Sequence, residues 1–242
     1  MPETDIDIDA LSSLGPEELL RYAAERFGDR AALGTSLQKT GTVMIDMAHR
    51  LGLSLRVFFI DTLLNHDETY ELLGEFEKRY GITIERFSPD PDQIESLNKS
   101  VGQYAHFLAR PMCCQVRKAA PLQKALATLD VWISGLRADQ SEHRRKEASK
   151  AGWTHVAQDR TILKLNPLLD WTSEDVDRYI DANKVPYNKL YDYVSEYGEK
   201  YNVIGCRMCH IPVRDEFDPR LGKFPWEQSK KECGLHDHGS GI

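Results

Sequence analysis

Five cysteines are the residues of this chain best suited to do chemistry, and four of them form two close pairs. Cys113 and Cys114 are adjacent in "PMCCQVRK", and Cys206 and Cys209 are separated by two residues in "GCRMCH". Thiolates are soft ligands that bind zinc or iron–sulfur clusters. Neighbours on a helix diverge by roughly 100°, which suits a cluster of several iron atoms better than one zinc ion. Two zinc-bound pairs or reduced core cysteines are the alternatives.

The fifth cysteine, Cys233, lies near the end of the chain in "KKECGLH", a stretch with little apolar surface to bury. The thiolate is the nucleophilic form of cysteine, and nearby cations lower the pKa of a thiol. Lys230, Lys231 and His236 are such neighbours, whereas Glu232 opposes them. The stretch is compatible with a nucleophile, and an exposed free thiol is the simpler alternative.

Alternating strands and helices must position these residues. Continuous apolar runs predict buried strands at 31–36, 55–61, 82–87 and 131–137. Amphipathic patterns predict helices at 15–28, 40–52, 67–81, 120–130 and 171–183, the last capped by Thr172 or Ser173. This alternation predicts an α/β fold, a Rossmann-like parallel sheet with helices on both faces. Ligands of such sheets lie outside the carboxyl ends of the strands, where "GTSLQKTG", "IDTLLNHDE" and "SGLRADQSEHRR" converge.

Composition narrows the class of protein further. The 31 basic and 38 acidic residues give a net charge of −7, which argues against general nucleic-acid binding. No apolar run is long enough to span a membrane, and the acidic N-terminus lacks an export signal. We therefore expect a cytoplasmic protein with reduced thiols. We expect two parts, a nucleotide-binding α/β domain at 1–213 and a C-terminal lid or tail at 214–242 that lies over the rim of the sheet.

Three motifs in order, "CCQVRKAAPLQKAL", "GCRMCH" and "ECGLH", resemble the iron–sulfur-containing assimilatory adenylylsulfate reductases of the adenylylsulfate/phosphoadenylylsulfate reductase family. The resemblance extends over about residues 30–236. It implies the adenine nucleotide alpha hydrolase-like form of the fold. It also implies an oxidoreductase of sulfate assimilation and cysteine biosynthesis that converts adenylylsulfate to sulfite and AMP. Thioredoxin or a glutaredoxin-like protein would be the reductant, and the oligomeric state, a homo-oligomer included, stays open.

The resemblance implies roles for individual residues. Cys233 matches the cysteine that attacks the sulfur of adenylylsulfate and forms a thiosulfonate, with His236 and Lys118 as further catalytic residues. The four paired cysteines match the ligands of a [4Fe–4S] cluster, namely Cys113, Cys114, Cys206 and Cys209. The implied substrate-binding residues are Ser36, Asp61, Thr62, Arg137, Arg144, Arg220 and Lys223.

The negative charge of the substrate explains why cations are needed at this site. A thiolate that approaches a sulfate group meets anionic oxygens, and positioned cations must offset the repulsion. Departures from the family pattern, such as leucine after "IDT" and His210 where a threonine is usual, concern substrate recognition rather than thiol chemistry. The alternatives are a phosphoadenylylsulfate reductase, which a comparison of kcat/KM for the two nucleotides distinguishes, and a nucleotide-binding sulfur-transfer or redox-sensing relative on the same fold.

Overall fold

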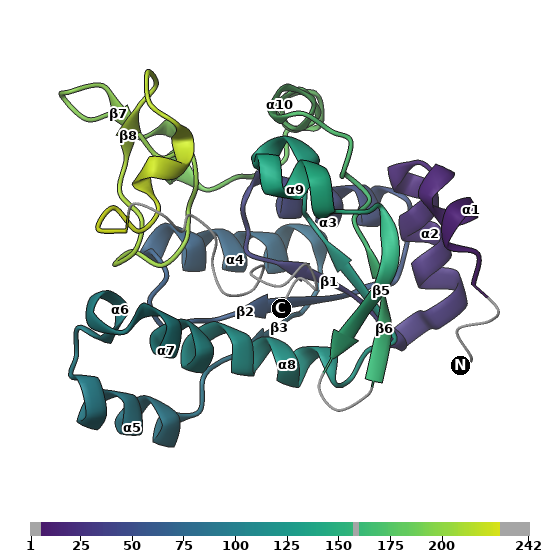
Figure 1. Ribbon diagram of the computed structural model, residues 1–242. Helices are drawn as coiled ribbons and strands as arrows, with labels where there is room; N and C mark the ends of the chain where they lie inside the picture. Colours follow the sequence, from purple (N-terminus) through teal and green to yellow (C-terminus); the bar gives the residue numbers. More distant parts are fainter. Residues whose placement is uncertain (1–5, 157–159, 228–242) are drawn as a thin grey trace.

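Six strands form the central sheet in the order β3-β2-β1-β4-β6-β5, and neighbouring strands are parallel except β5 and β6 (Figure 1). The computed structural model describes residues 6–156 and 160–227. The strands are β1 (Ala31–Thr35), β2 (Arg56–Ile60), β3 (Ile84–Phe87), β4 (Val131–Ser134), β5 (Ala151–Val156) and β6 (Arg160–Leu165). This is the α/β class that the sequence predicts, and the prediction is confirmed.

Helices cover both faces of the sheet because side chains alternate between the two faces along each strand. In β1, Ala31 and Leu33 lie in the larger core, whereas Ala32 between them lies in the smaller one. The larger core contains side chains of α1 (Ile8–Ser13), α2 (Pro16–Phe27), α3 (Lys39–Arg50), α4 (Asp67–Tyr80) and α10 (Ser173–Asn183). The smaller core packs against α8 (Ala120–Leu126). No helix within the described residues is long and apolar enough to cross a bilayer.

Two excursions from this layered fold contain the cysteine pairs. The first, between β3 and α8, consists of α5 (Pro91–Val101), α6 (Ala105–Leu108), α7 (Arg110–Cys114) and the π-helical turn η3 (Gln115–Ala119). The second follows α10 and consists of η5 (Lys189–Asp192), β7 (Glu199–Lys200), β8 (Val213–Arg214) and η6 (Pro219–Gly222). Figure 1 shows β7 and β8 standing apart from the central sheet. The remaining short elements are η2 (Gly28–Arg30), η4 (Ala138–Gln140) and α9 (Glu142–Glu147).

The predicted elements are found with small shifts at their ends. Strand β4 stops at Ser134 rather than 137, because the chain turns there into η4. Helix α10 begins after Thr172, whose side chain accepts a hydrogen bond from the Asp175 amide, so Thr172 is the cap. The antiparallel hairpin β5–β6 and helix α5 have no counterpart among the predicted elements. The division of the chain after residue 213 stays a prediction.

A buried carboxylate joins three helices of the larger core. Asp46 of α3 is 3% exposed and accepts hydrogen bonds from the hydroxyls of Tyr80, at the end of α4, and Tyr179 of α10, both at 2.9 Å. Burial, followed by the hydrogen bond to Asp46, raises the pKa of both tyrosines. Both hydroxyls therefore stay protonated and keep donating to Asp46.

We expect Asp46→Ala to lower the free energy of unfolding by about 3 kcal/mol, because it removes two hydrogen bonds to a charged acceptor inside the protein. Urea unfolding followed by circular dichroism measures the change. Asp170→Ala removes a carboxylate that is 67% exposed and pairs with Lys150, and should cost less than about 1 kcal/mol. Equal losses for the two variants would contradict the assignment.

Candidate active site

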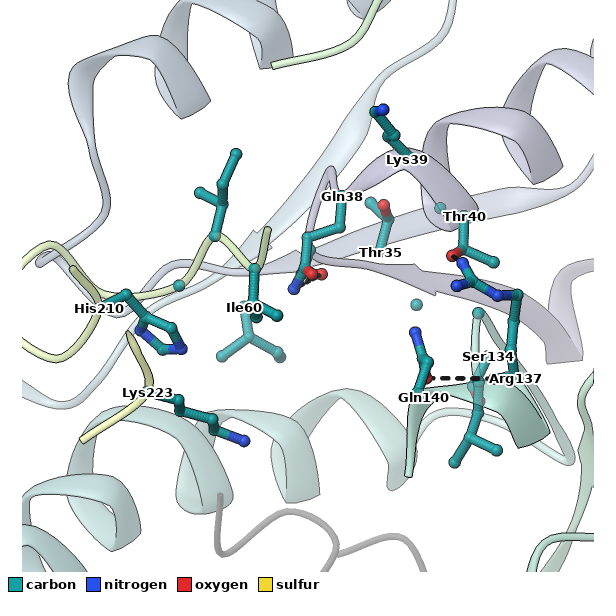
Figure 2. Close-up of a pocket in the computed structure, with 18 of the residues that line it drawn as sticks. Thr35, Gln38, Lys39, Thr40, Ile60, Ser134, Arg137, Gln140, His210 and Lys223 are labelled. Carbon is teal, nitrogen blue, oxygen red and sulfur yellow. Dashed lines mark hydrogen bonds between the residues drawn. The ribbon is translucent and has the colours of Figure 1, made fainter. Parts of the chain in front are cut away.

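A cavity of about 790 Å³ lies at the carboxyl ends of β1, β2 and β4. Its walls include these strand ends, the start of α3, the turn η4 and residues 202–206. In Figure 2, His210 and Lys223 lie on one side of Ile60, and Arg137 and Gln140 lie on the other. The volume suits a small organic ligand, and the position is the one expected for ligands of parallel sheets.

The cavity brings together half of the site residues predicted from the sequence. The predicted residues that line it are Ser36, Thr62, Lys118, Arg137, Arg144, Cys206 and Lys223. Arg220 lies in η6, and its side chain is outside the described part, as are Cys233 and His236. Asp61 is not among the lining residues. The functional roles of all these residues stay predictions.

Asp61 and Thr62 follow β2 and form a tight turn. The Asp61 carboxylate accepts hydrogen bonds from the Tyr70 hydroxyl at 2.7 Å and from the Leu63 amide at 2.9 Å. Burial, then the bond to Asp61, raises the pKa of Tyr70 to about 12. Leu63 has a φ of 58°, which an L-residue adopts only with support from its surroundings. The turn places the Thr62 hydroxyl oxygen 3.3 Å from the sulfur of Cys206.

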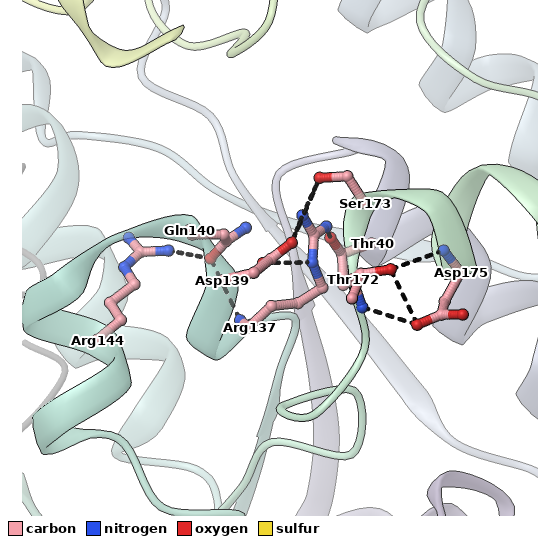
Figure 3. Close-up of polar contacts among 8 residues, drawn as sticks. All are labelled: Thr40, Arg137, Asp139, Gln140, Arg144, Thr172, Ser173 and Asp175. Carbon is pink, nitrogen blue, oxygen red and sulfur yellow. Dashed lines mark hydrogen bonds and ion pairs between the residues drawn. The ribbon is translucent and has the colours of Figure 1, made fainter. Parts of the chain in front are cut away.

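Arg137 is a fixed part of the cavity wall. It is 7% exposed, and its guanidinium donates to the Thr40 hydroxyl and the Ser173 hydroxyl, each at 2.8 Å (Figure 3). Its Nε donates to the Asp139 carboxylate at 3.0 Å. Arg137 therefore joins the loop after β4 to α3 and α10, and Asp139 neutralises much of its charge. Arg144, in contrast, contacts the neutral side chain of Gln140.

The first cysteine pair lies where an α-helix passes into a wider π-helical turn. Cys113 and Cys114 end α7 and are buried, and η3 follows directly. Such π-turns are frequent at functional sites. Burial raises the pKa of the Cys113 thiol, while Arg117 and Lys118 of η3 act against this. Arg117 also donates to the Thr62 carbonyl at 2.9 Å, so η3 is attached to the cavity wall.

The second pair lies in a turn closed by the Cys209 amide, which donates to the Cys206 carbonyl at 2.8 Å. Both sulfurs are buried against Phe224. Cys206 also interacts electrostatically with Cys113, so the two pairs face each other. The indole nitrogen of Trp226, which packs against this cluster, is buried without a hydrogen-bond partner among the described residues.

The chemistry of these donors fits a cluster of several iron atoms. All four are thiols without a disulfide. Within the described residues, no three His, Cys, Asp or Glu side chains are arranged to hold a single metal ion. A cubane provides a separate iron for each thiolate, so its ligands need not share one coordination shell. An inorganic sulfide would also accept the N–H of Trp226. These four thiols are therefore chemically suited to hold an iron–sulfur cluster.

His210 is a cavity residue that the sequence suggests only as a departure from the family pattern. A side-chain carbon on Gly205 would lie 2.3 Å from the His210 ring, so a glycine is needed there. Burial, then Lys118 and Lys223, lowers the pKa of His210 to about 3. The neutral ring has its Nδ1 3.4 Å from the Cys206 carbonyl oxygen. It therefore contributes no positive charge to the cavity at neutral pH.

Trp132 of β4 is a second cavity residue that sequence analysis misses. It is 6% exposed, lines the cavity, and its indole nitrogen lacks a hydrogen-bond partner among the described residues. A side-chain carbon on Gly34 would lie 2.7 Å from that nitrogen. The ammonium of Lys164 lies 4.6 Å from the centre of the Trp132 ring. The strand pattern of the sequence predicts only that Trp132 is buried. Only the structure shows that Trp132 also lines a cavity and that its N–H could therefore bind a ligand.

Comparison with known proteins gives consistent matches over most of the chain. Residues 30–212 match a family model described as "Phosphoadenosine phosphosulfate reductase domain". A Bacillus subtilis protein named "Adenosine 5'-phosphosulfate reductase 2" is 34% identical, over 90% of this chain and 88% of that protein. "Adenosine 5'-phosphosulfate reductase" of Allochromatium vinosum is 37% identical, over 86% of this chain and 79% of that protein.

Solved structures with the same fold include two kinds of protein. A phosphoadenylyl-sulfate (PAPS) reductase from Candida auris, in a phosphate complex, matches with a TM-score of 0.69 and 26% identity, over 87% of this chain and 98% of that one. An FMN adenylyltransferase from Candida glabrata matches with a TM-score of 0.55 and 14% identity, over 88% and 67% of the two chains. At that identity the second likeness shows the fold alone.

We expect Trp132→Phe to weaken binding of AMP about tenfold, because phenylalanine keeps an aromatic ring but removes the N–H donor of a residue that lines the cavity. Isothermal titration calorimetry measures the dissociation constant. Trp171→Phe is the matched control, since Trp171 packs against Tyr179 in the larger core and is not among the cavity-lining residues. Equal affinities for AMP in the two variants would show that the Trp132 N–H does not contact the nucleotide.

Proposed function

Because this chain belongs to the phosphoadenosine phosphosulfate reductase family, we propose that it reduces adenylylsulfate to sulfite and AMP in sulfate assimilation. Several relatives that are 34–37% identical over most of their length are named adenosine 5'-phosphosulfate reductases. One structural observation carries the proposal. The cavity and the four buried cysteines share a wall, because Thr62, Lys118 and Cys206 line the cavity and lie beside or within the cysteine pairs.

Cys233 is the nucleophile in this proposal. Its thiolate attacks the sulfur of adenylylsulfate, the bond from that sulfur to the bridging oxygen breaks, and AMP leaves with the electron pair. The product is a Cys233 thiosulfonate. Cys233 follows Glu227, the last described residue, by six positions, and six residues span at most about 20 Å. Lys223 lines the cavity just before this stretch, so the cavity is within reach of the thiol.

Cations drawn from separate elements offset the charge of the reacting groups. Lys118 from η3, Arg144 from α9 and Lys223 from the second excursion all line the cavity. Thiolate and substrate are both anionic, and fixed positive groups lower the cost of bringing them together. The N-terminus of α3, next to Ser36, is suited to a phosphate group. We therefore assign Ser36 to the phosphate end of the substrate, and Lys118 and Lys223 to the sulfate end.

Cys113, Cys114, Cys206 and Cys209 would hold the [4Fe–4S] cluster. When bound, the cluster supplies charge and rigidity next to the substrate rather than reducing electrons. Lys118 lines the cavity and acts electrostatically on both Cys113 and His210, and in this proposal it lies between the cluster and the substrate. Its ammonium group shields an anionic substrate from the cysteine thiolates.

The electrons come from a dithiol protein. A thiolate of thioredoxin, or of a glutaredoxin-like protein, attacks the Cys233 sulfur and releases sulfite, and the second thiol of the reductant regenerates Cys233. The reductant is thereby oxidised to its disulfide, and the two electrons of the reaction are accounted for. The four unbonded thiols in the described chain suit a reducing compartment, which supports the cytoplasm as the location.

We expect Cys233→Ser to reduce kcat/KM to below about a thousandth of the wild-type value, because a serine hydroxyl cannot form the thiosulfonate. Sulfite release with thioredoxin as reductant measures turnover. In wild-type protein mixed with adenylylsulfate and no reductant, mass spectrometry should detect an added sulfonate of about 80 Da on Cys233. Wild-type rates of sulfite release from the serine variant would overturn the proposal.

We expect the anaerobically purified protein to be brown and to contain about four iron and four sulfide per chain, since one cubane has that composition. Cys206→Ser should lower the iron content at least about twofold, because it removes one of four ligands. Cys233→Ser is the matched control and should retain full iron. A colourless preparation with stoichiometric zinc would remove the cluster assignment and leave the nucleophile assignment standing.

A further inference from the structure

Arg110 is a buried cation that contacts both a cysteine pair and the last described residue. It begins α7, and its side chain is 6% exposed. Its Nε donates to the carboxylate of Glu227 at 2.6 Å, across 117 positions of sequence. We propose that Arg110 is a positioning residue that fixes the base of the C-terminal segment bearing Cys233 to the first cysteine pair. The inference rests on the proposed role of Cys233.

Arg110 also interacts with Cys114, the last residue of α7. A planar guanidinium has five N–H donors in a rigid fork, so it can bind two anionic partners at once. Arg110 therefore connects a candidate cluster ligand to residue 227 through a single side chain.

Aromatic rings and a backbone hydrogen bond surround the contact between Arg110 and Glu227. The Arg110 guanidinium carbon lies 4.5 Å from the ring centre of Phe224. The rings of Phe107 and Trp226 are 5.3 Å apart, in an edge-on arrangement. The Phe224 amide donates to the Cys209 carbonyl at 2.9 Å. Residues 224–227 thus contact α6, α7 and the second cysteine pair. Arg110 is a cation that contacts two of these residues, Phe224 and Glu227.

The short stretch of chain between Glu227 and Cys233 explains why the position of Glu227 matters for the reaction. Cys233 is six residues beyond Glu227, so a fixed Glu227 confines the thiol to within about 20 Å of that point. A nucleophile held near its target reacts as though it were concentrated, and a looser tether lowers that effective concentration. Arg110 therefore acts on the sulfur transfer through the position of Cys233, without touching the substrate.

The test compares Glu227→Gln with Glu216→Gln, each as the iron-loaded protein. Glu216 lies in the same C-terminal segment and pairs with Arg214 at 3.5 Å on the surface. We expect Glu227→Gln to form the Cys233 sulfonate about tenfold more slowly in a single turnover without reductant, with unchanged iron content and AMP affinity. We also expect trypsin to cleave after Lys230 and Lys231 about tenfold faster, because the base of the segment is released. Glu216→Gln should match the wild type in every measurement.

Two outcomes separate this inference from the proposed function. If wild-type protein forms no sulfonate, the role of Cys233 is wrong, and the trypsin measurement alone still decides whether Arg110 and Glu227 fix the segment. If Glu227→Gln equals Glu216→Gln in both sulfonate formation and trypsin cleavage, the positioning role of Arg110 is refuted. Should Glu227→Gln lose iron, Glu227→Asp replaces it. This variant keeps the charge, shortens the side chain, and should change both rates in the same direction.

Discussion

In the proposed function, negative charge gathered at one place is the constraint on which the rest of this structure depends. Four thiols share a wall with a cavity suited to an anionic nucleotide, and thiolates would repel such a ligand at this range. The chain as a whole has a charge of −7, so the offsetting cations must be concentrated locally. Arg117 and Lys118 supply two of them in the turn that directly follows the first cysteine pair.

The topology of the chain brings these cations and the cysteines together. The first excursion leaves the sheet after β3 and returns through η3 and α8, and the second follows α10. Both excursions contribute residues to the cavity at the carboxyl ends of the strands, Lys118 from the first and residues 202–206 and Lys223 from the second. The turn after β2 joins them, since Thr62 contacts Cys206 through its hydroxyl and Arg117 through its carbonyl. The two excursions and the turn after β2 therefore explain together why the cysteines are buried, why their pairs lie near each other and why cations lie beside them.

Sequence pattern predicted the parts of the fold that depend on local periodicity. The four predicted strands were found because parallel strands are continuous apolar runs, whereas the hairpin β5–β6, with partly exposed positions, gives a weaker pattern. Spacing and residue type singled out the cysteines as candidates, and their roles were inferred from the resemblance to the family. Trp132, His210 and Arg110 could not, because their significance depends on burial and on partners far away in the sequence. Arg110, for example, precedes "PMCC" like any solvated arginine until Glu227 is seen beside it.

Burial and ion pairing also determine which side chains of this site can supply positive charge. His210 stands where a threonine is usual in the family, but a histidine enclosed with two lysines stays neutral and adds no positive charge. Arg137 adds little net charge either, because Asp139 already neutralises its guanidinium. The positive charge next to the cysteines then comes from Arg117, Lys118 and Lys223, and the two lysines lie near His210 and line the cavity. The neutral ring thus lies beside two lysines without adding another cation.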